Sequence, residues 1–151
     1  MIHSLVVALL LLPASRSNSA CICPAVPAHE QTRWGNEHIT ISTVTRVRVL
    51  KGTISDSNDS PMPNALIEVF TDPGQVTLPY SPAVEARRAR QRRIAACFTD
   101  AAGKFCIPRL PPGSYELRSS AQGFQAVSQT IKVIAKGRAR KHVSVRLPVA
   151  T

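Results

Sequence analysis

The sequence predicts an all-β sandwich built from seven antiparallel strands. From Val44 onward, short runs of alternating apolar and polar residues, rich in β-branched types, are separated by Gly, Pro, Asn and Asp at intervals of about ten residues. Residues 99–115, TDAAGKFCIPRLPPGSY, add the pattern of a tight turn followed by a proline-glycine corner and a further strand. About one hundred residues follow Val44, which is enough for one domain with its own core.

Alternation within each run assigns the faces of the predicted strands. In the first run, Val47 and Val49 are predicted to face the core, while Arg46 and Arg48 face solvent. An antiparallel sheet with one face on the core and the other exposed to solvent produces such a pattern. We predict strands at residues 45–55, 65–71, 94–99, 104–108, 114–121, 126–134 and 141–147.

The turn at residues 100–103 predicts a hairpin, with its glycine supplying a positive φ. If Thr99 faces Lys104 in this hairpin, then Cys97 faces Cys106 at about the Cβ spacing that a disulfide requires. We therefore expect a Cys97–Cys106 disulfide, which stabilises the fold by roughly 2 to 3 kcal/mol in the chain-entropy model.

The chain has four cysteines, an even number that favours disulfides in an exported protein. Pairing Cys97 with Cys106 leaves Cys21 and Cys23 as a candidate second pair, as an intermolecular link, or as one lipidated cysteine beside a free one. The rival pairing attaches the N-terminal segment to the hairpin. A single residue between Cys21 and Cys23 is too few for common zinc sites, so no metal is expected.

The N-terminal segment predicts export. Residues 1–20 have the apolar run and the small residues of a secretory signal peptide, and the run is too short to span a bilayer. The protein is therefore expected to be extracellular or periplasmic. Small residues before Cys21 also fit a lipoprotein signal, which makes Cys21 a candidate lipidation site and membrane anchor. Residues 21–43 are polar and irregular and predict an extension or linker, which leaves residues 44–151 as the sandwich domain.

Positive charge is the remaining signal in the sequence. Nineteen Lys and Arg residues against nine Asp and Glu residues give a net charge of +10, and the excess is concentrated in the insertion at residues 73–93 and near the C-terminus. So long an insertion is either functional or disordered, and here it is a short helix or a flexible arm. Such charge attracts anions, although a merely solubilising surface is the alternative interpretation. The candidate anion-binding residues are Arg87, Arg88, Arg90, Arg92, Arg93, Lys136, Arg138, Arg140 and Lys141.

Five short motifs are shared with a known family. They are Gly52-Thr53-Ile54-Ser55-Asp56, the segment from Pro61 to Ile67, the turn from Thr99 to Phe105, the corner from Leu110 to Leu117, and Gly123-Phe124. Through them, residues 51–147 resemble the carboxypeptidase regulatory-like domain. The resemblance implies a transthyretin-like (prealbumin-like) β-sandwich with Ig-like Greek-key topology, here carrying a basic insertion. It also implies a non-catalytic module for stability, adhesion or ligand contact.

Taken together, these features predict an exported binding or structural module that is not an enzyme and uses no cofactor. The expected partner is an envelope or extracellular protein or an anionic polysaccharide. Nucleic acid is an unlikely partner because the basic runs lack interleaved aromatic residues for base stacking. A membrane is contacted only through a lipid anchor. The alternative is a small hydrolase or metal-dependent enzyme on the same sandwich, since fold alone does not settle function.

Overall fold

The computed structural model describes residues 21, 23, 26–27, 38–71, 82, 86 and 89–150. Within these ranges the chain forms eight strands. They are β1 (His38–Val47), β2 (Leu50–Ser55), β3 (Leu66–Thr71), β4 (Arg93–Phe98), β5 (Lys104–Ile107), β6 (Gly113–Ser120), β7 (Ala126–Val133) and β8 (Val143–Arg146).

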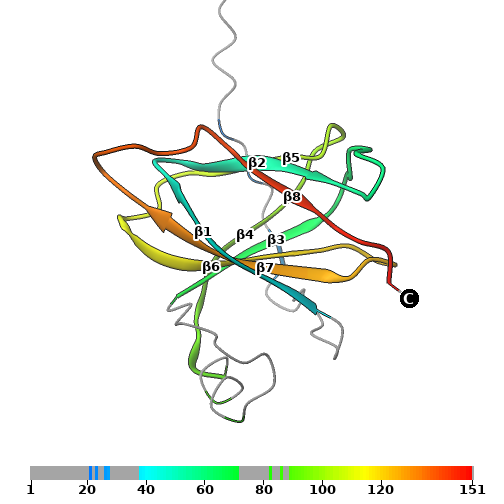
Figure 1. Ribbon diagram of the computed structural model, residues 1–151, viewed down its shortest axis with the longest axis horizontal. Coiled ribbons are helices and arrows are strands. Elements are labelled where there is room, and N and C mark those ends of the chain that lie inside the picture. Colours follow the sequence, from blue (N-terminus) through cyan, green and yellow to red (C-terminus); the bar gives the residue numbers. More distant parts are fainter. Residues whose placement is uncertain are drawn as a thin grey trace, which may run out of the picture.

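The strands form two stacked sheets (Figure 1). One sheet has five strands in the order β1-β7-β6-β3-β4, and the other has three in the order β5-β2-β8. The all-β prediction is therefore confirmed. Two strand pairs are parallel, β1 with β7 and β2 with β8, so a wholly antiparallel sandwich of seven strands is not what the chain forms.

The strand predicted at residues 45–55 is two strands that belong to different sheets. The chain bends at Arg48 and Val49, which sends β1 into the five-stranded sheet and β2 into the three-stranded sheet. The bend also changes which residues face inward: Leu50 is 1% exposed, whereas Val49, predicted to face the core, is 48% exposed. In addition, β1 begins at His38, inside the segment predicted as an extension, because it pairs with β7 along its length.

The hydrophobic core lies between the two sheets and contains most of the apolar residues that alternation predicts. At the centre of the three-stranded sheet, Gly52 lies between Phe105 on β5 and Val143 on β8. A Cβ atom at Gly52 would come within 2.8 Å of the Phe105 ring, so only glycine fits there. The largest fully buried apolar side chains are Leu50, Ile54, Ile67, Ile107, Leu117, Ile131, Leu147, Val47, Val69, Val127 and Val145.

The predicted tight turn is present, but the predicted hairpin is not. The Asp100 side chain accepts hydrogen bonds from the backbone N–H groups of Ala102 and Lys104, at 2.9 and 2.8 Å, and Gly103 has a φ of 69°. Strands β4 and β5 then join different sheets, so the turn is a crossing between layers. The expectation that Thr99 faces Lys104 and Cys97 faces Cys106 in one hairpin was therefore wrong.

The corner after β5 follows the predicted pattern. Pro111 and Pro112 lead into β6, and the Tyr115 hydroxyl donates a 2.7 Å hydrogen bond to the Pro111 carbonyl oxygen. Within the predicted insertion, residues 82, 86, 89 and 90 are helical, while residues 73–81, 83–85, 87 and 88 lie outside the described residues.

Candidate functional site

Seven exposed basic side chains lie at one end of the sandwich, and we call them the basic cluster. Two come from the end of β1, one comes from β7, and four come from the segment between β7 and β8. They are Arg46, Arg48, Lys132, Lys136, Arg138, Arg140 and Lys141.

Backbone pairing brings these residues together from distant parts of the chain. The parallel ladder between β1 and β7 sets Arg46 beside Lys132. Beyond β7, the chain continues along the end of β1, because the Arg140 N–H donates to the Arg46 carbonyl oxygen at 2.8 Å. The Arg48 guanidinium donates to the Gly137 carbonyl oxygen at 3.1 Å, which fixes the intervening loop. The cluster is thus a product of sheet topology.

The cluster carries a concentrated positive charge. The ion pairs among the described residues are Glu68–Arg93, Glu116–Arg118 and Asp59–Arg146, and none of them includes a member of the cluster. Beside it, a depression of about 400 Å³ is lined by Thr45 on β1 and by residues 140–144 leading into β8. A second depression, of about 510 Å³, holds the Asp59–Arg146 pair, so a cation there already faces an anion.

The arginines of the insertion fall into three groups. Arg87 and Arg88 lie outside the described residues. Arg90 and Arg92 are exposed. Arg93 opens β4, and its guanidinium forms a 3.0 Å ion pair with the fully buried Glu68 carboxylate. Arg93 therefore stabilises the five-stranded sheet, which corrects its assignment to an anion-binding arm.

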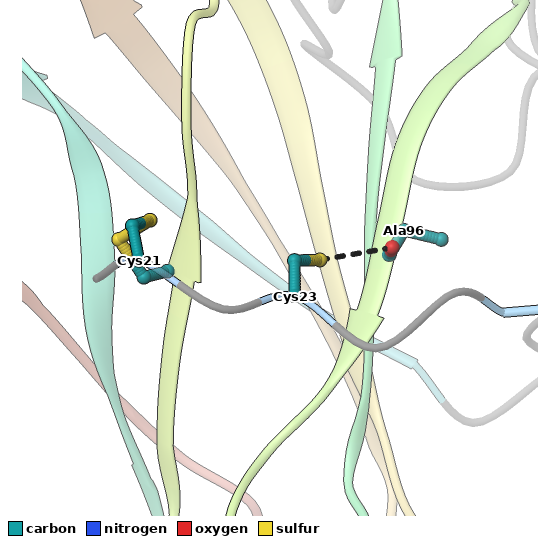
Figure 2. Close-up of a disulfide and its surroundings, with 4 residues drawn as sticks. Cys21, Cys23 and Ala96 are labelled. Atoms are coloured by element: carbon teal, nitrogen blue, oxygen red, sulfur yellow. Dashed lines mark hydrogen bonds between the residues drawn. A yellow bond between two sulfur atoms is a disulfide. The ribbon is translucent and has the colours of Figure 1, made fainter. Parts of the chain in front are cut away.

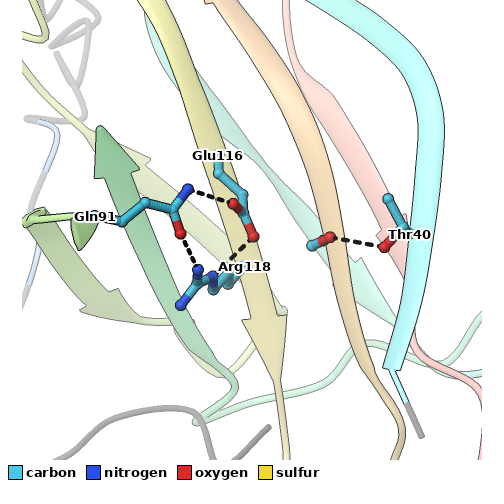
Figure 3. A network of polar contacts seen from close by, with 5 residues as sticks. Thr40, Gln91, Glu116 and Arg118 are labelled. Atoms are coloured by element: carbon cyan, nitrogen blue, oxygen red, sulfur yellow. Dashed lines mark hydrogen bonds and ion pairs between the residues drawn. The ribbon is translucent and has the colours of Figure 1, made fainter. Parts of the chain in front are cut away.

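A buried polar network lies on β6 of the five-stranded sheet (Figure 3). The Arg118 guanidinium donates to the Glu116 carboxylate at 2.9 Å and also donates to the Gln91 side chain. Gln91 in turn donates to Glu116 at 2.7 Å, and Arg118 stacks 3.8 Å over the Phe70 ring. The polar groups of these side chains are hydrogen bonded to one another, so we interpret the network as structural support for the five-stranded sheet.

The disulfide joins Cys21 to Cys106, with their Cα atoms 5.3 Å apart, so the predicted Cys97–Cys106 pairing is wrong (Figure 2). It failed because β4 and β5 are not partners in a ladder. The rival pairing, in which the N-terminal segment is attached to this region, holds instead. A sulfur in a disulfide cannot also carry a lipid thioether, which argues against lipidation of Cys21.

Cys23 and Cys97 are free thiols. Cys97 is fully buried on β4, and burial raises the pKa of its thiol far above the ordinary range, with a further rise from the neighbouring Cys23. Cys97 is therefore protonated at neutral pH and inert toward solvent reagents.

Within the described ranges, no three His, Cys, Asp or Glu side chains are grouped so that they could hold a metal ion. The same part of the chain has no helix long and apolar enough to cross a membrane.

Sequence reasoning missed Arg46 and Arg48 as members of the charged surface. Alternation correctly placed both on a wet face, and both are exposed. Their nearness to Lys136 and Arg138 depends on the parallel pairing of β1 with β7, for which the sequence carries no local signal. The candidates Lys136, Arg138, Arg140 and Lys141 do lie together, because they are close along the chain.

The two stacked sheets define a β-sandwich domain. A family model for the carboxypeptidase regulatory-like domain matches residues 49–148, which is most of the described sandwich. The chain belongs to the carboxypeptidase regulatory-like domain family. A search of curated proteins gave no match.

The chain is similar to several solved structures, among them three catechol or chlorocatechol 1,2-dioxygenases. The 3-chlorocatechol 1,2-dioxygenase of Rhodococcus opacus 1CP shares 12% identity, with a TM-score of 0.41, over 80% of this chain and 70% of that chain. The catechol 1,2-dioxygenase of Pseudomonas arvilla C-1 shares 16%, with a TM-score of 0.39, over 78% and 60%. The enzyme of Acinetobacter sp. ADP1 shares 14%, with a TM-score of 0.41, over 76% and 59%. Identities and TM-scores this low are no basis for assigning an activity.

Proposed function

We propose that this protein is an exported, non-catalytic binding module that holds an anionic polymer through the basic cluster. The observation that carries the proposal is the gathering of seven exposed cations, with no ion pair to another described residue, at one end of the sandwich. Unpaired surface charge of one sign concentrates counter-ions and attracts ligands of the opposite sign.

A polymer fits this surface better than a small anion does. The cations are spread over the end of β1, over β7 and over the loop that follows it, and each is exposed to solvent. A single exposed pair is worth little in water, so affinity must come from many weak contacts made by one chain. A polysaccharide or similar polymer with carboxylate or phosphate groups supplies such contacts.

Two features support export. Residues 1–20 have the pattern of a signal peptide, and the Cys21–Cys106 disulfide is of a kind that persists in oxidising compartments. Both fit a module that meets envelope or extracellular polymers.

The alternative function is a small hydrolase or metal-dependent enzyme on the same sandwich. It predicts that the purified protein carries stoichiometric iron or zinc, which elemental analysis would detect. No contact among the described residues favours it over binding.

Two matched variants test the proposed function. A cluster variant replaces Arg46, Lys136, Arg138 and Lys141 by glutamine, and an arm variant replaces Arg87, Arg88, Arg90 and Arg92 by glutamine. Each removes four positive charges, and both retain Arg93 because it pairs with Glu68. Binding of each to polyphosphate and to polygalacturonate at low salt is measured by calorimetry, with neutral dextran as the control polymer.

The cluster variant is expected to lose at least tenfold in affinity for both polyanions and to keep the wild-type melting temperature. The arm variant is expected to lose less than threefold. Equal losses in the two variants would mean that net charge alone drives binding, and an unaffected cluster variant would remove the basic cluster from the function.

A further inference from the structure

The four cysteines lie together where the edges of the two sheets meet. Strand β4 is an edge of the five-stranded sheet and β5 is an edge of the three-stranded sheet, and the short turn at residues 99–103 connects them. Cys97 lies on β4 and Cys106 on β5. Figure 2 shows Cys21 beside β5 and Cys23 between β5 and β4.

Cys23 is held against β4 by two contacts. Its thiol donates a 3.2 Å hydrogen bond to the carbonyl oxygen of Ala96, the residue before Cys97. Cys23 also packs against the hydrophobic core to which Cys97 belongs.

We propose that Cys23 and Cys97 are the site of a second disulfide, which forms on oxidation and completes a pair of bridges with Cys21–Cys106. The proposal rests on the juxtaposition of the two thiols and is independent of the polymer-binding function. Each bridge attaches the N-terminal segment to a different sheet, since Cys106 belongs to the three-stranded sheet and Cys97 to the five-stranded sheet.

The oxidation requires a disulfide compound as the electron acceptor, such as glutathione disulfide or an oxidised thiol-disulfide oxidoreductase. The Cys23 thiolate attacks one sulfur of that disulfide, which forms a mixed disulfide and releases the first thiol. The Cys97 sulfur then attacks Cys23, its proton passes to the leaving sulfur, and the second thiol departs. Two protein thiols are oxidised to one disulfide, and one disulfide of the acceptor is reduced to two thiols.

The order of attack follows from exposure. Cys23 is partly exposed, whereas Cys97 has no exposed surface and a strongly raised pKa. A reagent in solution therefore meets Cys23 first, and Cys97 reacts only with a sulfur already beside it.

The second bridge has a clear structural consequence. Exposed edge strands present unpaired backbone groups that can pair with other chains. The N-terminal segment lies next to the edge strand β4 at two places: Cys23 contacts Ala96, and the Arg93 guanidinium donates to the Pro27 carbonyl oxygen at 3.4 Å. A Cys23–Cys97 bond would fix this segment beside the edge of β4.

Peptide mapping of the full chain tests the proposal. The protein is equilibrated with glutathione and glutathione disulfide, alkylated in denaturant without reductant, and cut with trypsin. Cleavage after Lys104 separates Cys97 (residues 94–104) from Cys106 (residues 105–109), while the peptide ending at Arg33 carries both Cys21 and Cys23. We expect no alkylated cysteine and one assembly of all three peptides. Alkylated Cys23 and Cys97 in the wild-type protein would overturn the proposal.

Two single variants establish which cysteines are paired. Cys23→Ser is expected to release peptide 94–104 with an alkylated Cys97 while peptide 105–109 stays linked. Cys21→Ser is expected to do the reverse and free Cys106. If Cys23→Ser leaves peptide 94–104 linked to the Arg33 peptide, then Cys97 pairs with Cys21 and the proposed connectivity is wrong.

Discussion

At the scale of single residues, Glu68 is a charged side chain with a structural role. Its carboxylate has no exposed surface, and its partner Arg93 is 17% exposed at the side chain. A buried charge without its partner costs far more than an exposed one, because water cannot replace the lost contact. The sequence showed Arg93 as one of five similar arginines, and nothing in its neighbours along the chain separates it from Arg92.

Replacing Arg93 by methionine should therefore destabilise the protein by about 2 to 4 kcal/mol, since Glu68 is left buried with one cation fewer. The matched change Arg92→Met removes an exposed guanidinium and should cost less than about 0.5 kcal/mol. Urea denaturation of the two variants measures the difference. Equal midpoints for the two would mean that the Glu68–Arg93 pair contributes nothing to stability.

At the scale of strands and turns, the sequence predicted local features well and long-range pairing poorly. The bounds of β3 to β8 agree with the predictions to within about two residues, because alternation and turn residues act over a few positions. The break between β1 and β2 was missed, since Arg48 and Val49 continue the alternating pattern through the bend. The prediction of a hairpin was wrong because the same turn residues can also connect two strands of different sheets.

The bridge between Cys21 and Cys106 spans 85 residues, and closing so long a loop has a large entropic effect on the unfolded chain. In a Cys23→Ser background, adding Cys106→Ser should lower the free energy of unfolding by about 4 to 5 kcal/mol in the chain-entropy model. Adding Cys21→Ser instead should give the same loss, because either change breaks the same bond. The thiol freed by Cys106→Ser should be Cys21. More alkylation at Cys97 than in the Cys23→Ser variant alone would contradict the Cys21–Cys106 disulfide.

At the scale of the whole molecule, two regions of the sandwich differ in their chemistry. The cysteines lie where the edge strands β4 and β5 are joined, and the basic cluster lies at the end of β1, on β7 and in the segment between β7 and β8. We propose a second disulfide in the first region and polymer binding in the second. The basic residues of this surface could be identified from the sequence. Which of them lie close together is determined by the parallel pairing of β1 with β7.

The most direct measurement of the central claim is the salt dependence of polyphosphate binding by the wild-type protein and the cluster variant. Binding through several cations releases counter-ions, so the logarithm of the affinity should fall steeply with the logarithm of the salt concentration, by roughly 0.7 for each cation engaged. The four substitutions of the cluster variant should reduce the magnitude of this slope by about 3. A slope that is the same in both proteins would show that the basic cluster does not hold the polymer.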